Sequence, residues 1–193
     1  MSTFIVRKIH RILPLIALAA LAASTAANAL DDFDQVSPDA YLEVLNKGKE
    51  AYLKKDYDEA LPLVKQAACA GDKTSQWSLG QMYLLGQGVQ RDDVTGYSWL
   101  SAAAEFRPSP FSTALTKIEQ SVDPKDLSTL QSHGDALVDK YGISATRMSC
   151  RQSASRGGHI LDIVTCSPER QGRTVLIHRC LDDGSGTPAK AAP

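Results

Sequence analysis

This sequence lacks several motifs that would indicate a membrane span, an active site, a metal site or a phosphate loop. Beyond residue 29 it has no apolar run long enough to cross a bilayer. Histidine occurs there only as His133, His159 and His178, and none lies in a nucleophile elbow, a zinc-protease helix or a paired metal spacing. No Lys-Ser/Thr follows Gly86 and Gly88, so they do not form a phosphate loop. We therefore expect no enzymatic activity, no catalytic residue, no cofactor and no metal.

The N-terminus does have an apolar segment, from Ile12 to Ala23, preceded by Arg7, Lys8 and Arg11. It leads to the small-x-small sequence Ala27-Asn28-Ala29, which is typical of a signal peptidase site. The run is short for a spanning helix of about 20 residues, which disfavours an uncleaved anchor. No cysteine follows it as a lipid attachment site. We predict a signal peptide at residues 1–29, cleavage near Ala29, and a bacterial periplasmic or secreted protein.

Charge is unevenly distributed in the remaining chain. Residues 30–193 carry 18 basic and 22 acidic side chains, a net charge of −4. Residues 30–143 have a net charge of −7 and residues 144–193 a net charge of +3, with six arginines among the seven basic residues of the tail. These charges either solvate two surfaces, or the tail meets an anionic partner or folds back on the acidic part. We expect no nucleic-acid partner.

The central region has the pattern of a helical hairpin. Lys73 to Leu85 predicts a helix capped by Asp72, and Gly86 lies where the chain leaves that helix. A second helix starts at Asp92 or Asp93 and runs through Trp99 to Ala104. Asp56 and the alanine pair at 67–68 repeat this spacing 36 residues upstream, as expected of a helical solenoid.

The stretch LGQMYLLGQGVQRDDVTGYSWLSAAAE resembles a Sel-one-like repeat. The matching positions are Leu79, Gly80, Tyr83, Gly86, Gly88, Val89, Asp92, Trp99, Ala103 and Ala104. Gly96 stands where alanine is usual, which should loosen the second helix. The upstream stretch resembles a tetratricopeptide unit through Gly48, Tyr57 and Ala60, with Pro62 departing and expected to bend its helix. The resemblance implies an exported bacterial adaptor protein of stacked helical pairs.

A third helical pair is visible in weaker form. Phe111 to Ser121 predicts one helix, and Asp123-Pro124 starts another that ends at Gly142. We therefore predict a mainly α protein, with a short α-solenoid of about three helical hairpins followed by a small cysteine-bearing antiparallel β module. The expected domains are residues 30–143 for the helical repeats, 144–182 for the β module and 183–193 for a disordered tail.

The β module is predicted as a meander of three strands, each with one cysteine: Cys150, Cys166 and Cys180. Four cysteines in an exported chain suggest disulfides, and sequence leaves three connectivities open. Adjacent strands favour Cys150–Cys166, and Cys180 could then reach Cys69. The alternatives are a buried unpaired Cys69, and a zinc site drawn from the three tail cysteines, His159 and His178.

Two functional hypotheses follow. In the first, the chain binds a protein or peptide partner of the cell envelope through a groove on the first helices, at Lys49, Tyr52, Gln81 and Leu84. Tyr52 and Leu84 serve equally well as packing between repeats. In the second, the tail binds an anionic envelope polymer through Arg147, Arg151, Arg156, Arg173 and Arg179.

Overall fold

The structure is a computed structural model, and it describes residues 32–153 and 163–180. The chain divides into two units, residues 1–32 and 33–193, and the fold below is that of the second unit. Its helices are α1 (Pro38–Leu53), α2 (Tyr57–Cys69), α3 (Lys73–Leu85), α4 (Asp93–Ala103), α5 (Pro110–Glu119) and α6 (Pro124–Tyr141). Its strands are β1 (Phe33–Val36), β2 (Met148–Ser153), β3 (Ile163–Pro168), β4 (Arg170–Gln171) and β5 (Thr174–His178). The predicted signal peptide and disordered tail lie outside the described residues.

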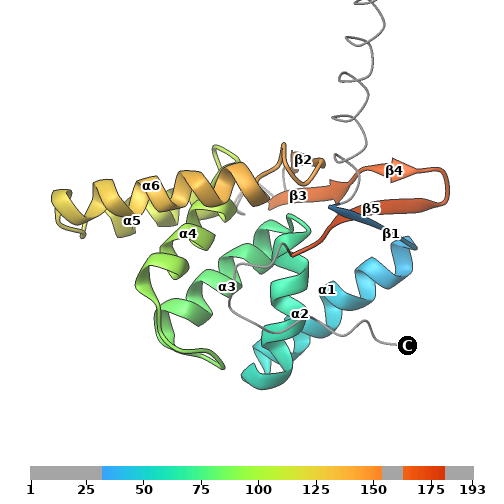
Figure 1. Cartoon of the computed structure of the whole chain (residues 1–193), viewed down its shortest axis with the longest axis horizontal. Helices are drawn as coiled ribbons and strands as arrows, with labels where there is room; N and C mark the ends of the chain where they lie inside the picture. The colour runs from blue at the N-terminus through green and yellow to red at the C-terminus, as the bar shows by residue number, and fades with distance from the viewer. Residues whose placement is uncertain (1–31, 154–162, 181–193) are drawn as a thin grey trace, which may run out of the picture. The chain divides into compact units, whose positions relative to one another are not determined.

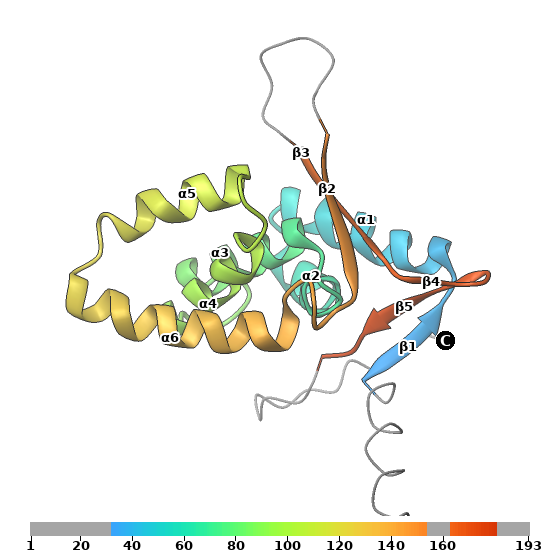
Figure 2. The ribbon, with the colours of Figure 1, turned by 90° about the horizontal axis from the view of Figure 1, so that it is seen from above.

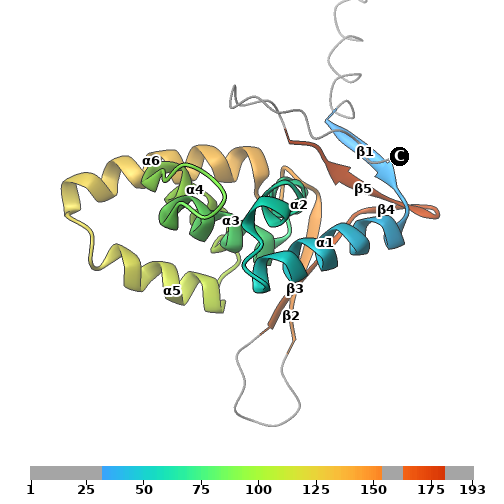
Figure 3. The same cartoon turned by 90° about the horizontal axis from the view of Figure 1, so that it is seen from below.

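The first four helices stack in chain order, as a solenoid requires. Helix α1 packs on α2, α2 on α3 and α3 on α4, and Figure 3 shows this succession. The third pair packs differently, because both α5 and α6 contact α4. Figure 2 shows α5 and α6 apart from one another and joined at one end. The expectation of a mainly α fold with about three helical hairpins is confirmed.

Side-chain caps explain where the helices begin. The side-chain oxygen of the N-cap residue accepts a hydrogen bond from a backbone N–H of the first turn in every helix, and the caps are Ser37, Asp56, Asp72, Asp92, Ser109 and Asp123. Such bonds satisfy amide groups that have no partner inside the helix. At the other end of α3, Gly86 has φ +65°, a left-handed conformation that glycine adopts without steric cost. The predicted caps and helix exit are confirmed.

Helices α3 and α4 approach each other through two glycines. A Cβ atom on Gly80 would lie 2.9 Å from the backbone oxygen of Gly96 and 2.6 Å from Leu100 Cδ2. A Cβ atom on Gly96 would lie 3.0 Å from the Gly80 oxygen and 2.7 Å from Leu84 Cγ. The glycine at 96 therefore has a steric role: it fits the close backbone contact within the second repeat.

Replacing Gly80 with alanine is expected to lower the free energy of unfolding by about 1–2 kcal/mol. Overpacking costs about 1–3 kcal/mol, and the better helix propensity of alanine offsets up to about 1 kcal/mol of it. Urea unfolding would measure the change. Thr74→Ala, on the exposed face of the same helix, is the control and should not be destabilising. A Gly80→Ala protein as stable as wild type would contradict the close contact.

A core cluster connects the helical pairs to the end of α6. It contains Leu79, Met82 and Trp99, with the small residues Ala60 and Ala68 between them. The Trp99 ring stacks on the ring of Tyr141, with 5.1 Å between centroids. Small alanines permit close helix packing, and the stacked aromatics fill the remaining space. The C-terminal end of α6 is thereby part of the repeat core.

The strands form two small sheets, whereas the sequence analysis predicts one meander. Strands β2 and β3 pair with each other, and β5 lies between β4 and β1 in the other sheet. All of the pairings are antiparallel. The meander prediction was wrong because β5 pairs with β1, a strand about 140 residues earlier in the chain (Figure 1). This pairing crosses the boundary that we predicted between residues 30–143 and 144–182.

Candidate functional site

The four residues predicted to form a groove lie on the first helices of the two repeats. Lys49 is exposed on α1, and Leu84 on α3 packs in a cluster with Tyr97 and Leu100. Between them, the Tyr52 hydroxyl donates a hydrogen bond to Gln81 Oε1 at 3.2 Å. The structure thus joins Tyr52 to Gln81 across the two helices, leaves Lys49 on the surface and gives Leu84 a packing role.

Two exposed leucines directly follow Tyr52 and Leu84 in the sequence, and the sequence analysis did not identify them. Leu53 is 69% exposed and Leu85 is 64% exposed, the highest values for large apolar side chains in residues 32–153 and 163–180. Each comes five residues after the buried glycine of its repeat, Gly48 or Gly80. This equal spacing was the signal that could have found them. They add apolar area at the C-terminal ends of α1 and α3.

The structure also contains a cavity that the sequence analysis did not predict. It has a volume of 440 Å³ and lies among α4, α5 and α6. Helix α4 contributes Tyr97 and Ser101, α5 contributes Leu115 and Glu119, and α6 contributes Gln131, Asp135 and Val138. Glu105 and Arg107, from the segment between α4 and α5, complete the lining. The sequence analysis predicts α5 and α6 only as a third, weaker helical pair, so it does not indicate a cavity between them.

A buried tyrosine positions a carboxylate at this cavity. Tyr97 is 4% exposed, and its hydroxyl donates a 2.6 Å hydrogen bond to Glu119 Oε1. Burial raises the pKa of Tyr97 well above its usual value, and the negative charges of Glu119 and Asp135 act in the same direction. Tyr97 therefore remains a neutral hydrogen-bond donor at physiological pH.

Raised tyrosine pKa values predict a loss of stability in alkali. Burial also raises the pKa of Tyr41. The ordinary pKa of a tyrosine is 10.0. Above that pH, tyrosines of the unfolded chain lose their protons, while folded Tyr41 and Tyr97 keep theirs. The folded state then binds more protons, so the free energy of unfolding falls by about 1.4 kcal/mol per pH unit for each tyrosine. Urea unfolding between pH 8 and pH 11 would measure this slope.

The matching variant is Tyr41→Phe. The Tyr41 hydroxyl is buried without a hydrogen-bond partner among the described residues, so its removal breaks no hydrogen bond there. The variant should be at least as stable as wild type at neutral pH, because an unsatisfied buried hydroxyl is unfavourable. It should also show a shallower alkaline slope. An unchanged slope would disprove the assignment to Tyr41.

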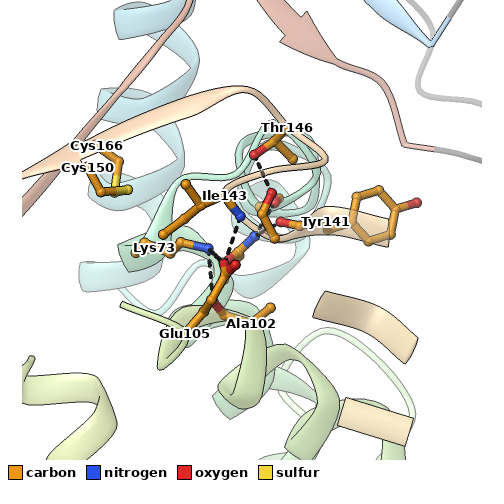
Figure 4. A network of polar contacts seen from close by, with 11 residues as sticks. Lys73, Ala102, Glu105, Tyr141, Ile143, Thr146, Cys150 and Cys166 are labelled. Atoms are coloured by element: carbon orange, nitrogen blue, oxygen red, sulfur yellow. Dashed lines mark hydrogen bonds and ion pairs between the residues drawn. A yellow bond between two sulfur atoms is a disulfide. The ribbon is translucent and has the colours of Figure 1, made fainter. Parts of the chain in front are cut away.

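A buried polar network lies at the junction between the repeats and the C-terminal segment (Figure 4). Lys73 is 2% exposed, and its Nζ donates to Gln76 Oε1 at 3.0 Å, Ala102 O at 2.9 Å and Glu105 Oε2 at 3.0 Å. The same Glu105 oxygen accepts from the Ile143 backbone N–H at 2.7 Å. Burial lowers the pKa of Lys73, and Glu105 opposes this shift. All three donors of the Lys73 ammonium are bonded to acceptors of the protein, so we assign the network a structural role.

The cysteines form two disulfides, Cys69–Cys180 and Cys150–Cys166. This is the pairing that the sequence analysis favours. The first joins the end of α2 to the residue two positions after β5, and the second joins paired residues of β2 and β3. A cysteine in a disulfide has no thiolate to offer a metal, so the predicted zinc alternative has lost its sulfur ligands. Of its two histidines, His159 lies outside the described residues.

The tail arginines are only partly free. Arg147 is 3.6 Å from Glu169 and lies over the Phe33 ring, and Arg179 is 3.6 Å from Asp34. Arg151 and Arg173 are exposed, and no ion pair involves them in residues 32–153 and 163–180. Arg156 lies outside the described residues. The five positions therefore do not form one free basic surface.

Two searches of the described residues bear on other functions. In residues 32–153 and 163–180, no group of three or more His, Cys, Asp or Glu side chains is placed to hold a metal ion. Over the same part of the chain, every helix is too short or too polar to cross a membrane. The two disulfides are consistent with an extracytoplasmic protein.

A comparison with protein families agrees with the first two helical pairs. The Sel1 repeat model matches residues 43–72 and 74–105, so it covers both units, including the one that resembles a tetratricopeptide. A similar solved structure is a protective antigen present in uropathogenic Escherichia coli strains and displaying an SLR fold. It is 27% identical, with a TM-score of 0.47, and the match covers 62% of this chain and 27% of that one. A search of curated proteins found no match.

Sel1 repeats commonly mediate protein–protein interactions, and proteins built from them are generally scaffolds without catalytic activity. The two matched segments coincide with the α1–α2 and α3–α4 pairs, which stack as successive repeats in the structure. Residues 43–72 and 74–105 of this chain are therefore two Sel1 repeats.

Proposed function

We propose that this chain is a non-enzymatic adaptor of the bacterial periplasm or cell envelope. It binds a protein or peptide partner through the surface of its first helices, α1 and α3. The observation that carries this proposal is the pair of exposed leucines, Leu53 and Leu85, at the ends of α1 and α3, the two helices that the Tyr52–Gln81 hydrogen bond joins. Exposed apolar side chains next to polar groups are typical of protein-binding surfaces. Lys49 is an exposed positive charge on α1.

The experiment is affinity capture from the native envelope with two matched variants. Leu53→Ser/Leu85→Ser removes the apolar side chains of the proposed surface, and Leu42→Ser removes a 50% exposed leucine elsewhere on α1. Captured proteins are quantified by mass spectrometry. The double variant should lose the partner by about tenfold or more, since each buried leucine contributes about 1.5 kcal/mol or more to binding. Equal capture by wild type and the double variant would refute this surface.

Export is part of the proposal. The basic and apolar N-terminal pattern and the two disulfides support it. The measurement is cell fractionation followed by N-terminal sequencing of the recovered protein. We expect it in the periplasm or medium, beginning at Leu30. A protein that retains Met1 and stays in the cytoplasm would contradict export.

A second function has support from Arg151 and Arg173, which are exposed on the C-terminal strands and their turn. They could bind an anionic envelope polymer, and such binding would weaken strongly at high salt. Truncation at Gly142 is a poor test, because it would remove β5 and the disulfide partner of Cys69. Arg151→Gln/Arg173→Gln preserves both. Loss of cell-wall binding in this variant, with partner capture unchanged, would favour the second function.

A further inference from the structure

We propose that the cavity among α4, α5 and α6 binds a lysine or arginine side chain from a peptide segment of the partner. We call it the α4–α6 cavity, and its lining residues are those given above. This inference rests on the proposed adaptor function and adds to it a second contact site, with a stated ligand chemistry. It is argued below from shape, charge and hydrogen bonding.

The helix arrangement leaves room for a ligand. Helices α5 and α6 both contact α4, and Figure 2 shows the two helices apart from each other except at the end where they are joined. The cavity of 440 Å³ lies in the range of small-ligand sites, which is about 300–1,000 Å³. A long side chain with part of its backbone fits in that volume. Buried Leu115 and half-buried Val138 offer apolar contacts for the aliphatic stem of lysine or arginine.

The charges favour a cation. Glu119 ends α5 and Asp135 lies on α6, so two carboxylates come to the cavity from different walls. Among the described residues, neither carboxylate forms an ion pair. The third carboxylate, Glu105, is already paired with buried Lys73. A cationic side chain that enters between Glu119 and Asp135 would therefore meet negative charge that the described fold does not neutralise.

One cation of the chain, Arg107, also lines the cavity. It precedes α5 whereas Glu119 ends that helix, and a ten-residue helix is about 15 Å long. The positive and negative ends of the cavity are thus separated along α5. A bound basic side chain would be directed to the Glu119 end, and a carbonyl oxygen of the peptide would suit the Arg107 end.

Tyr97 fixes the orientation of the Glu119 carboxylate, which is the proposed acceptor for the basic side chain. Its hydroxyl donates to one oxygen of Glu119 at 2.6 Å, and the other carboxylate oxygen forms no hydrogen bond with the described residues. Because Tyr97 is buried, Glu119 is oriented before any ligand arrives, and less conformational freedom is lost on binding. Ser101 and Gln131 supply further hydrogen-bonding groups in the lining.

The test is an NMR titration of the ¹⁵N-labelled protein with two capped peptides. The probe is acetyl-Ala-Leu-Arg-Leu-Ala-amide, and its partner has citrulline in place of arginine, which removes the charge and keeps the shape. The arginine peptide should shift the amide signals of Glu119, Gln131 and Asp135, and the citrulline peptide should bind about tenfold more weakly. Raising the salt from about 0.05 M to 0.5 M should weaken the arginine peptide.

Two variants and one control make the assignment specific. Glu119→Gln keeps an oxygen for the Tyr97 hydroxyl, and Asp135→Asn changes an exposed side chain, so both should fold. Each should weaken arginine-peptide binding about threefold to fivefold, as expected for a partly exposed ion pair. Asp58→Asn, an equal charge change on α2 outside the cavity, should leave binding unchanged. Unfolding midpoints of all three proteins confirm that the fold is intact.

Three results would overturn the proposal: no signal shifts at millimolar peptide, equal binding of the two peptides, or binding by the Glu119→Gln and Asp135→Asn proteins that is as tight as that of wild type. The adaptor function is judged separately. If envelope capture depends on Leu53 and Leu85 but not on Glu119 and Asp135, the adaptor function stands and the cavity proposal fails. If the cavity variants bind the peptide weakly but envelope capture is absent for wild type, the adaptor function fails instead.

Discussion

Replacing both Cys69 and Cys180 with alanine is expected to lower the free energy of unfolding by about 4–5 kcal/mol. The bridge joins residues separated by 111 positions, the longer of the two disulfide loops. Closing a longer loop removes more conformational entropy from the unfolded chain, so the longer loop contributes more. Cys69 is also 1% exposed at the end of α2, and alanine there leaves a small void. Urea unfolding under non-reducing conditions would measure the change.

The second disulfide is the matched control. Cys150 and Cys166 are separated by only 16 positions and join strands β2 and β3, which already pair with each other. Replacing both with alanine is expected to cost about 3 kcal/mol, less than the first pair. If the Cys150/Cys166 variant were the less stable of the two, loop length would not be the main source of stabilisation, and native-state strain or packing would have to explain the order.

Amide hydrogen exchange should also show which part of the fold loses stability without the Cys69–Cys180 bridge. Cys180 lies two residues after β5, and β5 pairs with β1 at the N-terminal edge of the described fold. Without the Cys69–Cys180 bridge, the amide protons of these two strands should exchange faster than those of α2 and α3, because a local opening no longer requires the global one. Uniform loss of protection would instead mean that the bridge stabilises the whole fold as one unit.

Local features of the sequence were sufficient to predict the repeats. Asp72 and Asp92 cap helices through bonds to residues two or three positions away, and Gly86 ends a helix through its own φ angle. Tyr52 and Gln81 were placed on one surface because each repeat has the same spacing from its glycine. In all of these cases the interaction partners are near in sequence or related by the repeat period, so a pattern in one chain is enough.

Apart from Cys69–Cys180, contacts between residues distant in sequence were not predicted. Strand β1 has four residues and pairs with β5 near the other end of the chain, so no local pattern indicates it. The α4–α6 cavity depends on the angle between α5 and α6, which hydrophobic periodicity does not report. Lys73 is the first residue of the predicted helix 73–85, and no local pattern indicates that it is only 2% exposed. Lysine is almost never fully buried unless it is paired, so the burial of Lys73 could be expected only once its partner Glu105 was known.

The partner of Lys73 leads to the second large prediction, for Glu105→Gln. The substitution keeps the size of the side chain and removes its charge, which leaves the Lys73 ammonium buried without a counter-ion. Breaking a buried ion pair in this way costs about 3–5 kcal/mol, and we expect a loss near 3 kcal/mol because Glu105 is 25% exposed and glutamine can still accept one hydrogen bond. Urea unfolding at pH 7 would measure it.

The exposed ion pair between Glu50 and Lys54 provides the control. Both side chains are more than half exposed, so Glu50→Gln should leave the melting temperature unchanged within error. The double variant Lys73→Met/Glu105→Gln removes the orphaned charge, and it should be more stable than Glu105→Gln alone. If the loss in the double variant equals the sum of the losses in Lys73→Met and Glu105→Gln measured singly, Lys73 and Glu105 do not act as a pair.

The pH dependence of the unfolding free energy distinguishes two causes of the loss in Glu105→Gln: the buried charge of Lys73 and the lost hydrogen bond from Ile143. Burial holds the pKa of folded Lys73 below its unfolded value of 10.5, and loss of Glu105 removes the main opposing influence. Between the two pKa values the unfolded chain binds the extra proton, so stability attributable to this group rises with pH. The difference in unfolding free energy between Glu105→Gln and wild type should therefore shrink as the pH approaches 10. The alkaline loss from Tyr41 and Tyr97 is common to both proteins and cancels in that difference. A deficit that stays constant from pH 7 to pH 10 would place the cause in the lost bond from Ile143 N–H rather than in the charge of Lys73.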